Sequence, residues 1–131
     1  MLSKTSTQVV NALVILAKLP KGQCEGAASI AKEIKAPANY LSKMLQFMCS
    51  TGIVESKRGL GGGFRLIKSP DKITLYEVVE PIDKVTVWEG CTLGLKKCSD
   101  KSPCAVHDDW KEVKDTYMKF LKTTSIASLV K

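Results

Sequence analysis

The pattern of apolar positions in the first part of the chain predicts three helices. Residues 3–19 carry apolar side chains on nearly all sides, which predicts a central buried helix that ends at Pro20. In residues 27–34 the apolar side chains share one face. In residues 38–50 they form a stripe opposite a polar and basic surface, and Gly52 caps the end. Two short helices joined by a tight turn are typical of a helix-turn-helix motif.

A β-hairpin with a basic, glycine-rich loop is predicted directly after these helices. Residues 53–56 and 64–67 alternate between apolar and polar side chains as strands do, and residues 57–63 lie between them with four glycines. A glycine-rich loop can instead hold a nucleotide phosphate. However, no Gly-Lys-Ser/Thr sequence follows, and the flanking segments are two strands rather than a strand and a helix. The loop is therefore interpreted as the wing of a winged helix-turn-helix.

Two further helices are predicted beyond the wing. Thr74 and Glu77 have the spacing of a capping box, which predicts a short helix that runs through Val79 and is stopped by Pro81. Residues 82–104 are expected to be mostly loop.

The final helix, residues 105–122, carries an apolar stripe with heptad spacing on an otherwise heavily charged surface. The stripe consists of Val106, Trp110, Val113, Tyr117 and Phe120. It could pack on its own domain, but the large aromatic side chains favour a two-fold dimer seam. The tail, residues 126–130, is expected to fold back on the core.

The predicted fold class is mainly α with a small β-hairpin, a winged helix-turn-helix followed by a long C-terminal dimerisation helix. The expected divisions are a DNA-binding domain at residues 1–82, a cysteine-containing loop at 83–104, and the dimerisation helix with its tail at 105–131. A chain of 131 residues with 44% hydrophobic residues suffices for one core and excludes a large multidomain enzyme.

Basic side chains outnumber acidic ones and leave a formal net charge of +7. Within residues 32–68 only Glu33 and Glu55 oppose the basic side chains, which are Lys32, Lys35, Lys43, Lys57, Arg58, Arg65 and Lys68. Double-stranded DNA is the expected partner, in preference to an acidic membrane surface. The expected DNA contacts lie at the exposed start of the second helix-turn-helix helix and in the wing: Ala38, Asn39, Tyr40, Ser42, Lys43, Lys57, Arg58, Gly61 and Gly62.

The compartment follows from the apolar run and the cysteines. The run at residues 9–17 is shorter than the ~18 to 20 residues of a membrane span, and no small-residue cleavage site follows it. The five cysteines are an odd number, and three of them crowd into one stretch, which does not suit a disulfide framework. We therefore expect a soluble cytoplasmic protein.

Three cysteines and the single histidine lie close together in the sequence. Cys91, Cys98, Cys104 and His107 follow the spacing C-x6-C-x5-C-x2-H, which offers three soft ligands and one borderline ligand. Structural zinc usually takes paired knuckles of closely spaced cysteines, whereas loose spacing on a loop suits an iron–sulfur cluster, because its ligands must reach around a larger unit. Zinc, and a cluster-free sensor that works by thiol oxidation of the three cysteines, are the alternatives.

Together these motifs resemble the winged-helix iron–sulfur transcription regulators of bacteria, the family typified by IscR, NsrR and RirA, and the IscR type most closely. The resemblance covers nearly the whole chain. It includes Tyr40 and Leu41 in the helix-turn-helix, the wing at 58–64, the three-cysteine loop and the ending at 121–130. It implies a homodimeric DNA-binding regulator, in most cases a repressor, whose cluster state alters its affinity for an operator.

The resemblance also implies how a cluster is held. Regulators of the IscR type bind a 2Fe–2S cluster through three cysteines and a histidine two residues beyond the last of them, which maps onto Cys91, Cys98, Cys104 and His107. Members without that histidine hold a 4Fe–4S cluster, so the 2Fe–2S form is favoured. The first gap has six residues here where the IscR type has five.

An enzyme is not expected from this sequence. It has no Cys-x-x-Cys redox motif and no convincing set of nucleophile, base and orienting residue around its one histidine. We therefore expect neither catalysis nor a small-molecule substrate.

Overall fold

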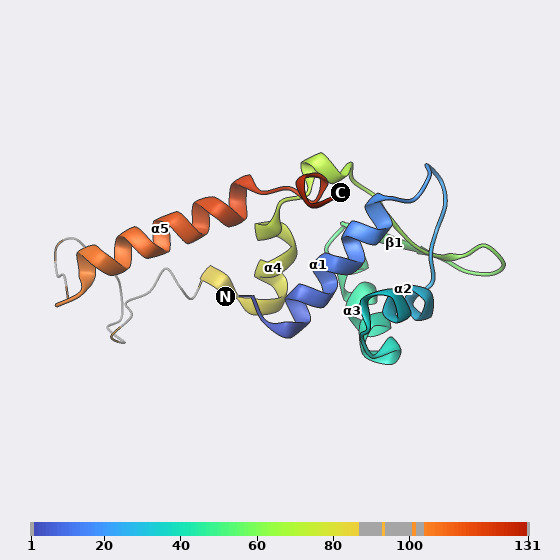
Figure 1. The fold of residues 1–131 in the computed structure, drawn as a ribbon, viewed down its shortest axis with the longest axis horizontal. Coiled ribbons are helices and arrows are strands. Elements are labelled where there is room, and N and C mark those ends of the chain that lie inside the picture. Colours follow the sequence, from blue (N-terminus) through green and yellow to red (C-terminus); the bar gives the residue numbers. More distant parts are fainter. Residues whose placement is uncertain (1, 87–92, 94–100, 102–103, 131) are drawn as a thin grey trace.

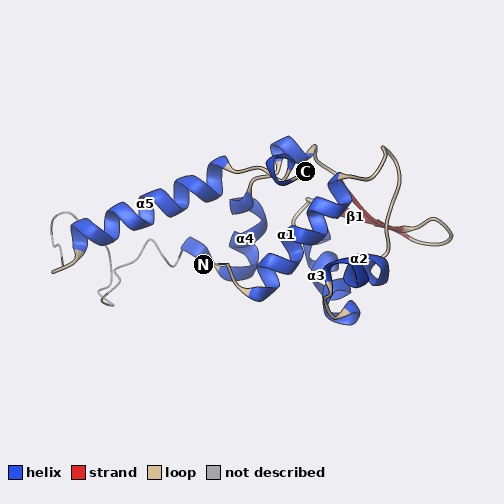
Figure 2. Ribbon diagram, in the orientation of Figure 1, coloured by secondary structure: helices blue, strands red, loops and turns tan. Residues whose placement is uncertain are grey.

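The chain folds into a winged-helix body from which one long helix extends (Figure 1). The computed structural model describes residues 2–86, 93, 101 and 104–130. Figure 2 shows that helices dominate the described chain and that its two strands form one antiparallel hairpin. This confirms the predicted fold class, mainly α with a small β-hairpin. The elements in chain order are α1 (Lys4–Ala17), α2 (Ala27–Ile34), α3 (Ala38–Ser50), β1 (Val54–Lys57), β2 (Gly63–Leu66), η1 (Pro70–Lys72), α4 (Leu75–Asp83), α5 (His107–Thr123) and η3 (Ala127–Leu129).

Helix α1 is the central element of the body. The Ser3 hydroxyl caps it by accepting a hydrogen bond from the Ser6 backbone N–H at 3.1 Å. Val9, Ala12 and Leu13 are fully buried, as the all-round apolar pattern predicts. The helix contacts α2, α3 and β2 as well as α4 (Figure 1). It therefore joins the helix-turn-helix to the C-terminal part of the chain.

Helices α2 and α3 form the predicted helix-turn-helix, with bounds that match the sequence prediction. In the turn, Lys35 takes a left-handed conformation with a φ of 57°, and Pro37 then precedes α3 as its N-cap residue. The C-terminus of α3 requires Gly52, whose φ is 81°. This conformation lets the Ile53 N–H donate to the carbonyl of Met48 at 3.4 Å, as in a Schellman motif.

The hairpin forms where the sequence predicts it, with each strand shifted by one residue. Ser56 lies opposite Phe64 in the register. A third segment extends the sheet, because Glu25 and Phe64 exchange two backbone hydrogen bonds of 3.0 and 2.8 Å. Phe64 is also buried in the core. The wing is therefore anchored to the segment between α1 and α2.

Helix α4 corrects one sequence prediction, because Pro81 does not stop it. Thr74 caps the helix by accepting the Glu77 N–H at 3.2 Å, as the capping-box spacing predicts. The Glu77 carboxylate, however, accepts hydrogen bonds from Lys68 instead of closing the capping box. The helix continues to Asp83. Pro81 lies in its last turn, where the missing N–H costs a single intrahelical hydrogen bond.

Helix α5 is the longest helix, and its N-terminal part extends away from the body (Figure 1). Met118 and Leu121 are buried near its C-terminus, where it contacts α4. The tail then returns to the core, since the Ile126 N–H donates to the Ile73 carbonyl at 2.9 Å and Ile126 is fully buried. None of the described helices is both long and apolar enough to cross a membrane.

Candidate nucleic-acid interface and cysteine site

The predicted DNA-contact residues of α3 lie on its exposed face. Leu41, Leu45 and Met48 occupy the opposite face and are buried in the core. This packing directs the start of α3 outward. The structure leaves the predicted contacts on the solvent side, with Ser42 half-buried and the others exposed, namely Ala38, Asn39, Tyr40 and Lys43.

Tyr40 has a partner that the sequence did not indicate. Its ring is 44% exposed, yet its hydroxyl lies 2.8 Å from the Thr5 hydroxyl of α1, and the two form a hydrogen bond. The two residues are 35 positions apart, on α3 and α1, so no local pattern relates them. Tyr40 therefore presents its ring to solvent while its hydroxyl is tied to the first helix.

The wing presents Lys57 and Arg58 to solvent, with Gly61 exposed and Gly62 half-buried. The turn is closed by a 3.0 Å hydrogen bond from the Gly62 N–H to the Gly59 carbonyl. Gly61 takes a φ of 74°, as the third residue of a type II turn requires. Figure 1 shows the wing at the end of the body near α2 and α3, away from the N-terminal part of α5.

Gly62 is required for space rather than for its backbone angle. A Cβ at this position would overlap the Lys57 carbonyl oxygen and lie 2.8 Å from the Gly59 carbonyl oxygen. Both neighbours are backbone atoms, so a side chain cannot be accommodated without opening the turn.

We expect Gly62→Ala to distort the wing and weaken DNA binding while leaving the helical body folded. Gly61→Ala is the matched control, because a Cβ there meets open space and only the left-handed conformation is strained, at a cost of about 1–2 kcal/mol. DNA affinity and far-ultraviolet circular dichroism of both variants test this. Equal losses of affinity would contradict the steric role of Gly62.

Arg65, the other basic side chain of the hairpin strands, is already paired within the protein. Its guanidinium donates to the Glu55 carboxylate on the neighbouring strand. The pair lies directly across the hairpin, where Glu55 faces Arg65 in the register. The wing charges offered to a polyanion are therefore those of Lys57 and Arg58.

Cys104 and His107 lie together at the start of α5. Cys104 is half-buried and His107 is buried, with 5% of its surface exposed. The backbone N–H of His107 donates to the backbone carbonyl of Cys104 at 3.1 Å. This hydrogen bond closes a turn that keeps the two residues close together. Cys91 and Cys98, the other two predicted ligands, lie outside the described residues. Within the described part of the chain, no group of three or more ligand side chains gathers in one place.

The two remaining cysteines lie away from this segment. Cys24 is in the stretch between α1 and α2, and Cys49 is in the last turn of α3. Burial raises the pKa of the Cys49 thiol, and the nearby Glu55 charge adds to this despite a hydrogen bond with Ser56. Cys49 is thus held in its unreactive thiol form at neutral pH.

These features define a winged helix-turn-helix DNA-binding protein with a cysteine and a histidine at the start of a long helix. The chain belongs to the Rrf2 family, described as iron-dependent transcriptional regulators, whose model matches residues 2–131. The protein is therefore a DNA-binding transcriptional regulator and not an enzyme.

Relatives and solved structures agree with this assignment. A protein of Aquifex aeolicus (strain VF5), assigned as an HTH-type transcriptional regulator, is 36% identical over 129 residues, which cover 95% of this chain and 90% of that protein. The HTH-type transcriptional regulator IscR of Photorhabdus laumondii is 29% identical over 103 residues, which cover 79% of this chain and 62% of that protein.

Two solved structures share the fold. CymR (YrzC), the global cysteine regulator of B. subtilis, superimposes with a TM-score of 0.80 at 21% identity and covers 98% of this chain and 95% of its own. T. potens IscR superimposes with a TM-score of 0.77 at 20% identity, covering 98% of this chain and 85% of its own. At these identities the likeness concerns the fold alone.

Proposed function

We propose that this regulator is a homodimeric repressor whose affinity for its operator is controlled by an iron–sulfur cluster, held by Cys91, Cys98, Cys104 and His107. The observation that carries the proposal is the placement of Cys104 and buried His107 one turn apart at the start of α5, directly after the segment that holds the other two cysteines. The identity to IscR proteins supports it.

The donor set fits such a cluster chemically. Three thiolates and one imidazole are ligands that iron–sulfur clusters use. The resemblance to regulators of the IscR type favours the 2Fe–2S form over the 4Fe–4S form. When bound, a cluster supplies a centre whose occupancy and oxidation state follow the supply of iron and exposure to oxygen or nitric oxide. Cys104 and His107 would tie that centre to the first turn of α5, and the cluster loop at residues 83–104 would carry the remaining ligands.

Control of DNA binding follows from linkage. Ligation would tie the ligand-bearing segment to the start of α5, and DNA affinity would change only to the extent that one arrangement of the two DNA-binding domains is favoured. Coupling of about 1 to 3 kcal/mol changes affinity roughly 5-fold to 150-fold, which is sufficient for a genetic switch.

The DNA-binding surface in this proposal consists of the start of α3 and the wing. The exposed start of α3 would approach base edges in the major groove, while Lys57, Arg58 and the wing glycines would follow the phosphates or enter the minor groove. Residues 1–82 would form the DNA-binding unit, and residues 105–131 would pair two copies.

Arg58→Ala is expected to weaken binding to every duplex and to reduce the slope of log affinity against log salt by about one unit, because one phosphate contact is lost. Anisotropy titrations of a labelled duplex over a salt series measure this slope. Lys119→Ala removes the same charge from an exposed position on α5 and is expected to leave the slope unchanged. A normal slope in Arg58→Ala would exclude Arg58 from the phosphate contacts.

The test of cluster binding is an absorbance spectrum with iron and acid-labile sulfide assays on protein purified without oxygen from iron-replete cells. Visible bands with matched iron and sulfide are expected, and their stoichiometry distinguishes the 2Fe–2S from the 4Fe–4S form. Colourless protein without either element would contradict the proposal.

A cluster-free thiol switch is the second candidate function. The likeness to CymR structures favours it, because CymR is the global cysteine regulator of B. subtilis and the Staphylococcus aureus CymR structure, with a TM-score of 0.79 at 20% identity, is of an oxidized form. In this case Cys91, Cys98 and Cys104 would respond by forming sulfenic acid or a disulfide. Colourless protein whose three thiols are readily alkylated, and whose DNA affinity changes on peroxide treatment, would support this candidate.

A further inference from the structure

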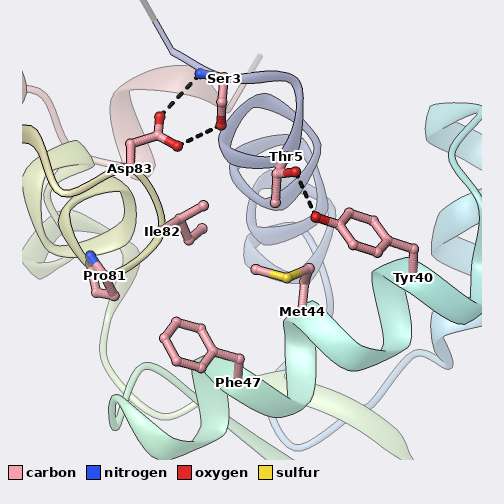
Figure 3. A pocket seen from close by; sticks show the side chains of 8 residues that line it. All are labelled: Ser3, Thr5, Tyr40, Met44, Phe47, Pro81, Ile82 and Asp83. Atoms are coloured by element: carbon pink, nitrogen blue, oxygen red, sulfur yellow. Dashed lines mark hydrogen bonds between the residues drawn. The ribbon is translucent and has the colours of Figure 1, made fainter.

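A single carboxylate joins the end of α4 to the start of α1. Asp83 is the last residue of α4 and the first residue of the cluster loop, residues 83–104. One of its oxygens accepts the Ser3 backbone N–H at 3.0 Å, and the other accepts the Ser3 hydroxyl at 2.6 Å (Figure 3). Because both oxygens are used, Asp83 holds the backbone and the side chain of one residue at the same time.

This contact determines the orientation of the cap of α1. The Ser3 hydroxyl has one proton, which it donates to Asp83, and a lone pair on the same oxygen accepts the Ser6 N–H. Burial raises the pKa of Asp83, whereas the hydrogen bonds from Ser3 lower it, and the pKa lies below its usual range. The carboxylate is therefore charged at neutral pH and acts only as an acceptor.

The first turn of α1 also contacts α3, the second helix of the helix-turn-helix, which we call the recognition helix. Thr5 lies two residues after Ser3, and its hydroxyl hydrogen-bonds to the Tyr40 hydroxyl at the start of α3. Figure 3 shows the two hydrogen-bonded pairs on the same end of α1, one facing α4 and the other facing α3. The start of α1 thus contacts the end of α4 and the start of α3.

A groove separates α3 from α4 beneath this connection. It has a volume of about 560 Å³. Its apolar lining comes from both helices and consists of Met44, Phe47, Pro81 and Ile82 (Figure 3). The polar contacts through α1 therefore bridge the start of α3 and the end of α4 at one side of this groove.

Helix α4, which ends at Asp83, also contacts α5. Burial raises the pKa of Tyr117 on α5, and the negative charge of Asp83 raises it further. The same helix begins at His107. A shift of α5 relative to α4 would therefore affect the surroundings of Asp83.

We propose that Asp83 is a positioning residue for DNA recognition, which transmits the position of α5 through Ser3 and Thr5 to Tyr40 on the recognition helix. The regulatory part of this inference rests on the proposed function, while the positioning of Tyr40 does not. The chain of contacts has two hydrogen-bonded links between residues distant in sequence, Asp83 to Ser3 and Thr5 to Tyr40. The backbone of the first turn of α1 connects Ser3 to Thr5.

The test is a double-mutant cycle on the full chain with Asp83→Asn and Thr5→Val. Asparagine retains one acceptor oxygen, so at most one of the two bonds to Ser3 survives, and valine has the shape of threonine without its hydroxyl. The probes are a labelled duplex selected by the wild-type protein from a random-sequence library and a scrambled duplex of the same length. Asp71→Asn and Thr123→Val are the matched controls, since each loses the same group from a hydrogen bond elsewhere.

We expect each single variant to bind the selected duplex about 3- to 10-fold more weakly, the range for one lost hydrogen bond. The double variant should bind no more weakly than the weaker single variant, because both changes interrupt one chain of contacts. Affinity for the scrambled duplex should stay within twofold of the wild type. Additive losses, or losses equal to those of the matched controls, would overturn the proposal.

Two further measurements keep the result interpretable. If Asp83→Asn does not fold, Thr5→Val and Tyr40→Phe form the cycle, and the double variant should then equal Tyr40→Phe; additivity would again overturn the proposal. Repeating the original cycle with cluster-loaded and cluster-free protein separates the two claims. Equal wild-type affinities in both states would refute cluster sensing alone, whereas a wild-type response that Asp83→Asn retains in full would refute the transmission through Asp83 alone.

Discussion

Cys104→Ala is expected to abolish the visible absorbance of the protein together with its bound iron and sulfide. A cluster held by three thiolates and one imidazole has no substitute for a missing thiolate at the start of α5. The Cys104 side chain is only half-buried, so its loss should leave the melting temperature nearly unchanged. Anaerobic absorbance, iron and sulfide assays and thermal unfolding measure these quantities.

Cys49→Ala is the matched control for this change. Its thiol is held protonated by burial, so the variant should retain the full absorbance. His107→Ala tests the fourth ligand separately from the three cysteines. A cluster that persists in this variant with shifted absorbance bands would show that the three thiolates still bind it. Full absorbance in Cys104→Ala would remove Cys104 from the ligand set.

Val113→Asp is expected to convert the protein from a dimer to a monomer and to lower affinity for a two-fold operator by about 100-fold or more, because an unpaired charge in an apolar seam is costly and paired half-site contacts are lost. Three side chains of the apolar stripe are exposed to solvent: Val106 by 38%, Val113 by 57% and Phe120 by 50%. Their helix extends from the body, so the surface is available to a second copy (Figure 1).

Sedimentation equilibrium and DNA titration measure the two effects of Val113→Asp. Lys119→Gln changes the net charge by the same amount outside the stripe and should remain dimeric. A dimeric Val113→Asp protein would show that the exposed stripe is not the seam. Val113 is suited to this test because Met118 and Leu121 pack on the body, whereas Val113 is exposed on another face of α5.

Elements whose boundaries depend on neighbouring residues were predictable. The bounds of α3 follow from Pro37, the apolar stripe and Gly52, which act within one or two turns of the helix. The same kind of reasoning was wrong at Pro81. A proline is disfavoured in a helix interior, which led to the prediction that α4 stops there. The helix instead continues for two residues and ends at Asp83, so Pro81 lies in its last turn.

Some features of the candidate sites were likewise predictable from neighbouring residues, and others were not. The exposed start of α3, the basic wing and the group of cysteines were visible as residue types at short spacing. The sequence placed Tyr40 on the exposed face, but only the structure places its hydroxyl against Thr5. It likewise could not relate Asp83 to Ser3, which is eighty positions away along the chain.

Local sequence was therefore enough to predict the helices, the hairpin and the chemical character of the basic and cysteine-bearing segments. These depend on backbone periodicity, capping and charge, which act over a few residues. Three features became apparent only in the folded chain: α1 contacts both the recognition helix and α4, His107 is buried, and one face of α5 packs on the body while another stays exposed. Those features arise from the packing of whole helices against one another, and side chains distant in sequence meet only once that packing is set.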